Sequence, residues 1–343
     1  MPGTKEITVT TMPAERLHLD LDRATRTIAD ALRTQVGEVL GRSGLVVAMS
    51  GGVDSSVCAG LAVQAVGAKR VLGLALPERD SDPESLGLAR EWAATLGIEF
   101  VVEDITPALE GAGCYARRDA AVKRVVPAYG AGWRCKLVLD AGGLAPDRLH
   151  VCHLAVQAPE GEIETVRLPS REFREIVAAT NFKQRVRKMM EYYHADRLHY
   201  AVVGTPNRLE YDQGFFVKGG DGLADVKPIA HLYKSQVFQL AEHLGVPAGI
   251  RGRTPTTDTY SLPQTQEEFF FSLPLRELDL VLEARNSGRA ADEVARDLGL
   301  TAAQVERVYR DIDWKRRATQ YLHLPPLLVE PVAEADARSG GTR

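Results

Sequence analysis

The sequence of 343 residues lacks several features that mark particular classes of protein. Its four cysteines, Cys58, Cys114, Cys135 and Cys152, form no CxxC pair, so we expect free thiols rather than a disulfide framework or a zinc site. No apolar run reaches about 18 residues and the N-terminus carries no signal sequence, which favours a cytoplasmic protein without a membrane partner. The net charge of −4 argues against nucleic acid as a partner.

The first third of the chain alternates between apolar runs typical of buried strands and patterns typical of helices. Strands are expected at 44–49, 68–76 and 98–105. Helices are expected over 22–40, through Val57 and Val66, and over 81–97. This order of elements predicts an α/β fold with a doubly wound parallel sheet.

The remaining sequence is less regular. Residues 106–147 show no clear pattern, and the segments after them predict a β-hairpin at 149–168, helices over 170–196 and 231–246, a strand at 198–205 and two short helices within 287–317. We therefore expect an N-terminal extension over 1–20 and one domain over 21–330 with an insertion at 106–179. The tail at 331–343 is expected to be disordered.

The stretch VVAMSGGVDSSV, residues 46–57, places a glycine-rich turn between a predicted strand and a predicted helix. Backbone N–H groups and the helix dipole form an anion site in such a turn, and Gly51 and Gly52 allow the backbone to approach the anion closely. Asp54 would repel a phosphate unless Mg²⁺ lies between them. The stretch matches neither GxxxxGK[ST] nor GxGxxG, so it is neither of the two common nucleotide loops.

The motif SGGVDSS resembles the PP-loop of the ATP pyrophosphatases, which split ATP between its α- and β-phosphates. Within residues 180–247, the segments NFKQRVR, GTPNRLE, GFFVKGGDGLAD and PIAHLYKSQV resemble the NAD synthases of the ammonia-dependent type, and RTPTTD and WKRR match further segments of that family. The resemblance implies that ATP, with Mg²⁺, adenylates the carboxylate of deamido-NAD and that ammonia then displaces AMP. It also implies a homodimer.

The resemblance implies roles for individual residues. ATP would be bound by Ser50, Gly51, Gly52, Asp54, Ser55, Ser56, Lys218, Lys234 and Thr256. Mg²⁺ would be held by Asp54, Glu210 and Thr256, and the acceptor by Asn181, Arg185, Asp221, Asp225 and Lys315. Glu210 follows one predicted strand as Asp54 follows another, so both carboxylates should lie at the same edge of a parallel sheet.

Some segments differ in sequence from the family pattern, and the differences affect the expected acceptor site more than the expected ATP site. They are the insertion, the segment LPERDSDPES after the second predicted strand, and Trp314 where the family often has a histidine. An alternative is therefore a synthase-like amide ligase that adenylates another carboxylate. Two further alternatives are a sulfur-transferring PP-loop enzyme, which would need a reactive Cys114 or Cys135, and a non-catalytic nucleotide-binding relative.

Two further expectations concern ammonia and the shielding of the adenylate. The sequence before the loop is short compared with the glutaminase domain of the family's glutamine-using members. The resemblance therefore implies free ammonia, or ammonia from a separate supplying subunit. An acyl-adenylate must be kept from water, and the polar segment at 256–274 is the candidate lid.

Overall fold

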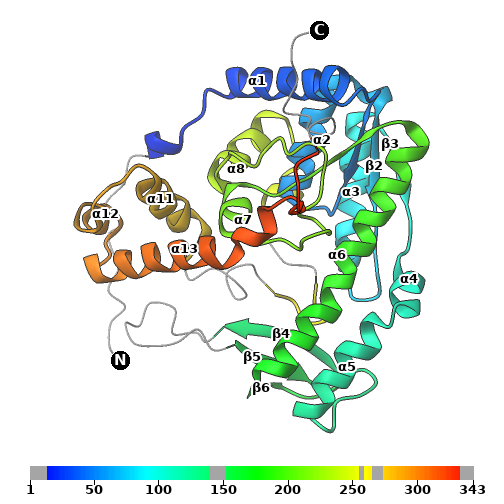
Figure 1. The fold of residues 1–343 in the computed structure, drawn as a ribbon, viewed down its shortest axis with the longest axis vertical. Helices are drawn as coiled ribbons and strands as arrows, with labels where there is room; N and C mark the ends of the chain where they lie inside the picture. The colour runs from blue at the N-terminus through cyan, green and yellow to red at the C-terminus, as the bar shows by residue number, and fades with distance from the viewer. Residues whose placement is uncertain (1–13, 140–151, 255–258, 265–272, 333–343) are drawn as a thin grey trace.

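The computed structural model describes residues 14–139, 152–254, 259–264 and 273–332 (Figure 1). Its centre is a parallel sheet with the strand order β3-β2-β1-β7. These strands are β1 (Leu45–Ala48), β2 (Val71–Ala75), β3 (Glu99–Val102) and β7 (Ala201–Val203). The predicted doubly wound α/β fold is confirmed.

Alternate residues of the central strands enter different cores, because successive side chains of a strand point to opposite faces. Leu45 and Val47 pack on one face, against α1 (Leu21–Thr34), α2 (Val53–Val66), α3 (Pro83–Leu96) and α8 (Lys234–His243). Val46 packs on the other face, against α4 (Thr106–Gly111), α5 (Cys114–Val125) and α6 (Ser170–Leu198). The helix expected over 22–40 ends its α-helical part at Thr34 and continues as a π-helix, Gln35–Val39.

A second, antiparallel sheet has the order β4-β5-β6. β5 (Cys152–Gln157) and β6 (Ile163–Arg167) form the hairpin predicted at 149–168, apart from residues that lie outside the described part. β4 (Arg134–Leu139) was not predicted. The 29-residue helix α6 joins the two sheets, since it is about 44 Å long at ~1.5 Å per residue. Its Ile176 belongs to the core of the antiparallel sheet and its Val186 to that of the parallel sheet.

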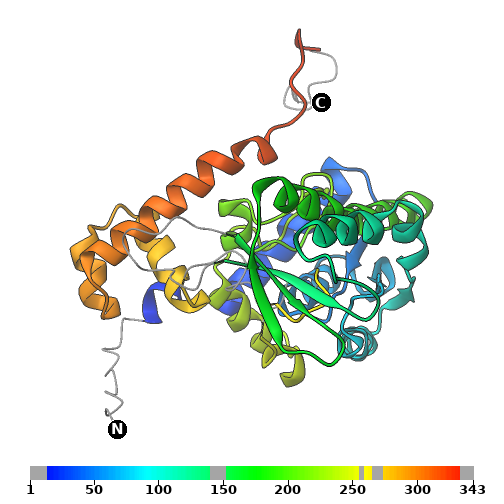
Figure 2. The ribbon, with the colours of Figure 1, turned by 90° about the horizontal axis from the view of Figure 1, so that it is seen from below.

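The C-terminal helices form a third body with its own core. They are α11 (Leu275–Asn286), α12 (Ala291–Leu298) and α13 (Ala302–His323). Leu17, within the expected N-terminal extension, also packs in this core. The second of the two helices expected at 287–317 is longer than predicted, since α13 extends to His323 before Pro325. Figure 2 shows residues 324–332, directly after α13, projecting away from the sheets.

The remaining described elements are short: η1 (Ala14–Leu17), η3 (Ala68–Arg70), α7 (Arg208–Gln213) and α9 (Ala248–Arg251). Among the described residues, no helix combines the length and the apolar character needed to cross a membrane.

Candidate active site

A cavity of about 1050 Å³ lies at the C-terminal edge of the parallel sheet. Ala48, Ala75 and Val203, which end β1, β2 and β7, all line it. Residues of α6 and of the antiparallel sheet form a second wall, and Trp314 and Lys315 of α13 form a third. Open α/β sheets bind their ligands beyond the carboxyl ends of the strands, so this cavity is the candidate active site.

The glycine-rich loop predicted to bind an anion lies between the end of β1 and the start of α2. Gly51 has φ 73°, and the carbonyl oxygen of Ser85 is too close to leave room for a Cβ there. The hydroxyl oxygens of Ser50 and Ser55 lie 3.2 Å apart, and Ser50 Oγ accepts a hydrogen bond of 3.3 Å from the N–H of Gly52. Since the first N–H groups of α2 have no partner within the helix, the loop presents donors suited to a phosphate.

Asp54 lies in a cluster of charges beside this loop. Its Oδ2 forms an ion pair with Lys234, and its Oδ1 accepts a hydrogen bond of 3.1 Å from Asn207 Nδ2. The backbone N–H of Asn207 donates to Glu210 Oε2 at 3.0 Å. Asp54 and Glu210 thus lie at the same edge of the sheet, as predicted, because β1 and β7 are parallel neighbours. Burial lowers the pKa of Lys234, but the charges of Asp54 and Glu210 outweigh it and leave that pKa raised.

The C-terminal helices hold Lys234 in place. Lys234 is the first residue of α8, and Asp279 of α11 accepts hydrogen bonds from its backbone N–H at 3.2 Å and from that of Ser235 at 2.6 Å. Asp279 is buried, and burial raises its pKa to about 6. The carboxylate therefore caps α8 and fixes the backbone that carries Lys234.

Three residues predicted to contact the acceptor also line the cavity: Asn181, Asp221 and Lys315. The ammonium of Lys315 lies 2.8 Å from the carboxylate of Asp311 one helical turn away. Burial lowers the pKa of Lys315, and Asp311 offsets only part of that effect. Burial raises the pKa of Asp221, whose Oδ1 accepts a hydrogen bond of 2.7 Å from the N–H of Val217.

Other predicted residues are not among those that line the cavity: Gly51, Ser56, Lys218, Arg185 and Asp225. Ser56 donates to Gly52 O at 2.9 Å within the loop, and Asp225 accepts a hydrogen bond of 2.7 Å from Val202 N–H beside the sheet.

Lys218 lies at the end of α13, where its ammonium donates to the carbonyl oxygens of Tyr321 and Leu324 at 2.7 and 3.0 Å. Arg185 Nε donates at 3.3 Å to the carbonyl oxygen of Lys218. Thr256 lies outside the described residues. The roles of all these residues stay predictions.

Sequence reasoning missed a buried charge network behind the cavity. Lys183 of α6 is fully buried, and its ammonium contacts Glu78 at 2.9 Å and Asp80 at 2.8 Å. Arg118 donates to the same Asp80 at 2.7 Å, and Tyr115 donates to Glu78 at 2.6 Å. Lys183 stands within the quoted NFKQRVR, but spacing alone gives no sign that its partners lie about 100 residues away, between β2 and α3.

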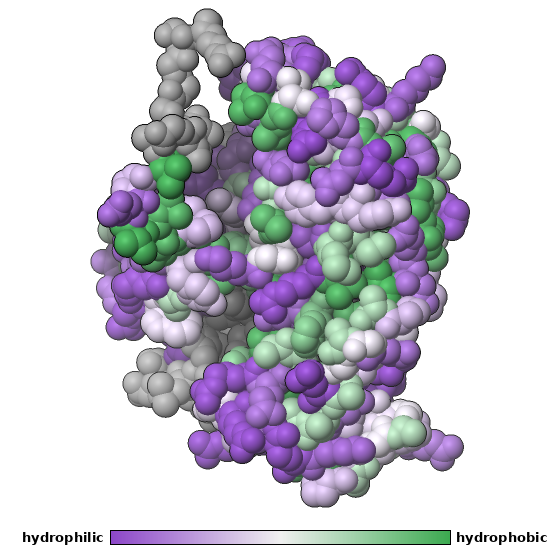
Figure 3. All heavy atoms as spheres, turned by 45° about the vertical axis from the view of Figure 1, so that its right-hand side comes forward, coloured by the Kyte–Doolittle hydropathy of each residue, from purple (hydrophilic) through white to green (hydrophobic). Residues whose placement is uncertain are grey.

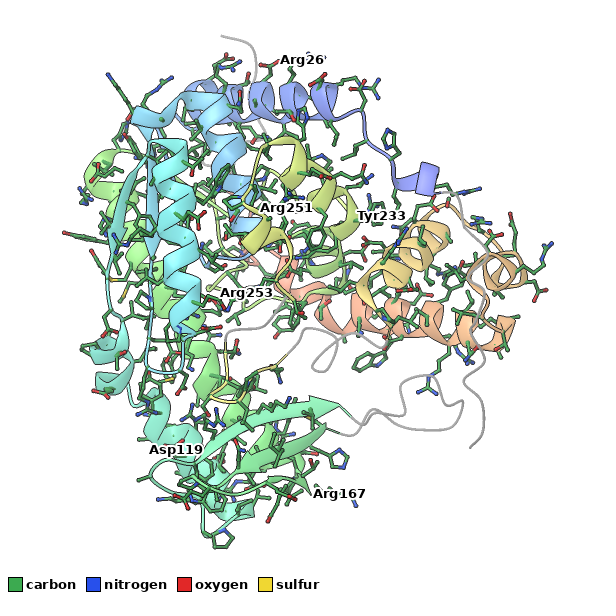
Figure 4. All side chains as sticks on the ribbon, turned by 180° about the vertical axis from the view of Figure 1, so that it is seen from behind. Arg26, Asp119, Arg167, Tyr233, Arg251 and Arg253 are labelled. Carbon is green, nitrogen blue, oxygen red and sulfur yellow. The ribbon has the colours of Figure 1, made fainter. Side chains whose placement is uncertain are left out.

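Arg253 was also missed, although it stands in the quoted RTPTTD. It lies near the centre of the molecule beside α3 (Figure 4) and lines the cavity. Its guanidinium donates to Ser85 Oγ at 2.7 Å and forms an ion pair with Asp82. Ser85 also packs against Gly51. It therefore lies between Arg253 and the glycine-rich loop.

The cluster around Asp54 can hold Mg²⁺ in the way usual for nucleotide enzymes. No group of three or more acidic, histidine or cysteine side chains suited to a metal occurs within the described ranges. Mg²⁺ in such enzymes is commonly bound by one or two carboxylates together with substrate phosphates and water. Asp54 and Glu210 line one cavity and share Asn207, so they supply a donor set of this kind.

Comparisons with known proteins show the family of the chain. The sequence model of the NAD synthase family matches residues 24–124 and 155–319. The chain is 58% identical over 323 residues to the NH(3)-dependent NAD(+) synthetase of Rhizobium meliloti (strain 1021), covering 94% of this chain and 96% of the relative. It is 38% identical to that of Thermotoga neapolitana, with 70% and 76% covered.

Solved structures share the fold at lower identity. The NMN synthetase of Francisella tularensis superposes with a TM-score of 0.62 at 22% identity, covering 91% of this chain and 99% of the other. The NH3-dependent NAD synthetase of Campylobacter jejuni gives 0.58 at 19%, covering 91% and 100%. With the family model matched on both sides of residues 125–154 and with these close relatives, the chain belongs to the NAD synthase family.

Proposed function

We propose that this protein catalyses the ATP-dependent amidation of deamido-NAD to NAD with ammonia as the nitrogen donor. The observation that carries the proposal is the meeting of the glycine-rich loop, Asp54, Glu210 and Lys234 at the rim of one cavity. Relatives more than 50% identical over nearly the whole chain bear the name NH(3)-dependent NAD(+) synthetase, which supports ammonia and this product.

The residues suit the first chemical step, in which a carboxylate oxygen attacks the α-phosphorus of ATP and pyrophosphate leaves. The N–H groups at the start of α2 and the hydroxyls of Ser50 and Ser55 hold the departing phosphates. Lys234 neutralises charge that develops there, and its raised pKa keeps it protonated. Asp54 and Glu210 would hold Mg²⁺, which would supply positive charge to offset the negative charge of the phosphates.

In the second step ammonia attacks the carbonyl carbon of the acyl-adenylate, AMP leaves, and one proton is released. The cavity is large enough to hold a nucleotide and part of an acceptor together, because ligand sites of this kind commonly measure roughly 300–1,000 Å³. Asn181, Asp221 and Lys315 line it and are the described candidates for acceptor binding.

An amide ligase for a different carboxylate stays the second candidate function. The observation that favours it is the fold shared with the NMN synthetase of Francisella tularensis, whose name indicates a mononucleotide product. Sulfur transfer gains no such support, since Cys114 and Cys135 are buried and do not line the cavity. Burial also raises the pKa of both thiols, which disfavours the reactive thiolate.

The test incubates the protein with Mg-ATP and ammonium and with either deamido-NAD or the deamidated form of NMN. The expected result is NAD and pyrophosphate in equal amounts from deamido-NAD, at a kcat/KM at least about tenfold above that for the mononucleotide, which corresponds to ~1.4 kcal/mol of discrimination. If pyrophosphate were released with the deamidated mononucleotide but not with deamido-NAD, the mononucleotide would be the acceptor instead.

We also propose a homodimer that uses α6. Met189 and Tyr193 stand four residues apart on this helix and are each 58% exposed. Side chains at this spacing share one face of a helix. Figure 3, turned toward the side that carries α6, shows a diagonal band of apolar residues, together with smaller apolar patches elsewhere on this face.

A further inference from the structure

The strand β4 lies entirely in residues 125–154, which the sequence model of the family leaves unmatched. It is an edge strand, with β5 on one side only. An edge strand presents unpaired backbone N–H and C=O groups, which other segments can bind. Within the described residues, the segment that occupies this edge is 259–264, which we call the strap.

The strap binds β4 at alternate residues. Cys135 donates its N–H to Ser261 Oγ at 2.9 Å, and its carbonyl oxygen accepts from Leu262 N–H at 3.2 Å. Two residues further along β4, Leu137 O accepts a hydrogen bond from the side chain of Gln264. Cys135 and Leu137 present their backbone groups to the same edge because they are two residues apart. The strap therefore follows β4 much as a further strand would.

Lys183 and Tyr260 fasten the other end of the strap. Lys183 donates to the carbonyl oxygen of Thr259 at 2.7 Å while its charge is balanced by Glu78 and Asp80. Tyr260 is 6% exposed and belongs to the core of the antiparallel sheet. Thr259 and Tyr260 also line the cavity, so the fastened end is part of its wall.

We propose that β4 and Lys183 are positioning elements that hold the strap as a preformed wall of the nucleotide cavity. Without β4, the strap would lose the hydrogen bonds of Ser261, Leu262 and Gln264. A preformed wall spares the entropy cost of ordering the segment when ATP binds. The inference rests on the proposed function where the KM for ATP is measured. The measurement of hydrogen exchange in the protein without ligands does not depend on that function.

The first experiment loosens the β4 contact. Ser261→Ala removes the acceptor of the Cys135 N–H, and Leu262→Pro removes the donor to the Cys135 carbonyl. Both variants should speed hydrogen exchange in peptides that contain residues 134–139, in the protein without ligands. Both should raise the KM for ATP, by about fivefold for Ser261→Ala, with a smaller change in kcat, since one lost hydrogen bond costs ~1 kcal/mol.

The matched control is Arg134→Gln on the same strand. Arg134 donates to the side chain of Gln157 at 2.5 Å, on the side of β5, and among the described residues it bonds no atom of the strap. The hydrogen exchange of residues 134–139 and the KM for ATP of Arg134→Gln should equal those of the unaltered protein. Unchanged exchange and unchanged KM in both strap variants would overturn the inference. An unaltered protein that forms no NAD while the strap variants do exchange faster would count against the proposed function alone.

The second experiment separates positioning by Lys183 from simple charge balance. Lys183→Met leaves Glu78 buried without its cation and should lower the melting temperature. The double variant Glu78→Gln/Lys183→Met removes both charges, while Asp80 keeps Arg118, and should recover most of that loss. If Lys183 positions the strap, the KM for ATP stays raised in the double variant, since Thr259 still lacks its donor. A return of KM to normal would show that Lys183 only balances charge.

Discussion

At the scale of single residues, Lys234 connects the chemistry to the fold. Its side chain is 2% exposed and pairs with Asp54, while its backbone is held by Asp279. A buried ammonium with this much support serves as a fixed positive charge rather than a mobile one. Such preorganised charges contribute most to catalysis where negative charge develops.

We predict that Lys234→Met lowers kcat/KM for pyrophosphate release by roughly 100- to 1,000-fold, the usual cost of losing one such charge. Asp54→Ala should abolish pyrophosphate release, because it removes a proposed Mg²⁺ ligand and the partner of Lys234. A coupled pyrophosphate assay measures both. Lys69→Met, at an exposed lysine after α2, is the control and should keep full activity. Full activity of Asp54→Ala would contradict the assignment of the loop.

Asp279 gives a prediction about pH. Burial raises its pKa in the folded protein to about 6, above the ordinary value of an aspartate, so the folded state binds its proton more tightly than the unfolded state does. The stabilisation from this proton is complete below about pH 4 and is lost as pH rises through about 6. Relative to Asp279→Asn, the unaltered protein should therefore lose at most about 3 kcal/mol of unfolding free energy between about pH 4 and pH 7.

Urea unfolding of both proteins at several pH values measures that difference. Other titrating groups are shared by the two proteins and cancel in the comparison. A difference that grows in favour of the unaltered protein with rising pH would mean that the carboxylate is stabilised by its hydrogen bonds to α8 more than it is destabilised by burial.

At the scale of elements, the loop between β1 and α2 depends on a close contact with the start of α3. Gly51 needs φ 73° and has the carbonyl oxygen of Ser85 against it. Gly51→Ala would bring a Cβ into that oxygen and would strain the backbone, so the loop must shift.

We predict a loss of stability of at least about 1 kcal/mol and a clear rise in the KM for ATP in Gly51→Ala. Calorimetry and steady-state kinetics measure the two effects. Gly67→Ala is a useful comparison, because Gly67 also has positive φ, at 82°, but has open space around its Cα. It should lose stability without a change in KM. Equal effects on KM from both variants would refute the importance of the Ser85 contact.

At the scale of the whole molecule, three bodies surround one cavity: the parallel sheet, the antiparallel sheet and the C-terminal helices. The long helix α6 connects the two sheets, and Asp279 connects the C-terminal helices to α8. The free face of α6 is the surface on which we place a second copy of the chain.

We predict that Met189→Lys/Tyr193→Lys converts a dimer into a monomer, since two charges would then stand at the centre of an apolar contact. Size-exclusion chromatography with light scattering measures the mass. Leu328→Lys changes another exposed apolar residue, 63% exposed and beyond α13, and should leave the mass unchanged. A monomeric unaltered protein, or a variant that stays dimeric, would exclude this face.

The sequence was sufficient to predict the parallel sheet and the loop, because both depend on local patterns. Continuous apolar runs mark β1 and β2, and SGGVDSS marks the turn between β1 and α2. The sequence also predicted that Asp54 and Glu210 lie at the same edge of the sheet, because each follows a strand and the two strands, β1 and β7, are parallel. β4 was missed because its alternation of polar and apolar residues covers only residues 134–137, and its pairing with β5 and the strap leaves no mark in the local sequence.

By itself, then, the sequence determined the fold class, the nucleotide loop and the family, since each is written in residues that lie near one another along the chain. Only the tertiary structure decided which charges meet. Lys183 contacts Glu78, which is 105 residues away in the sequence, and Lys234 contacts Asp54, which is 180 residues away. Cys135 bonds Ser261 of the strap at a separation of 126 residues. Such pairs leave no local pattern, because their geometry arises when separate elements pack around a common core.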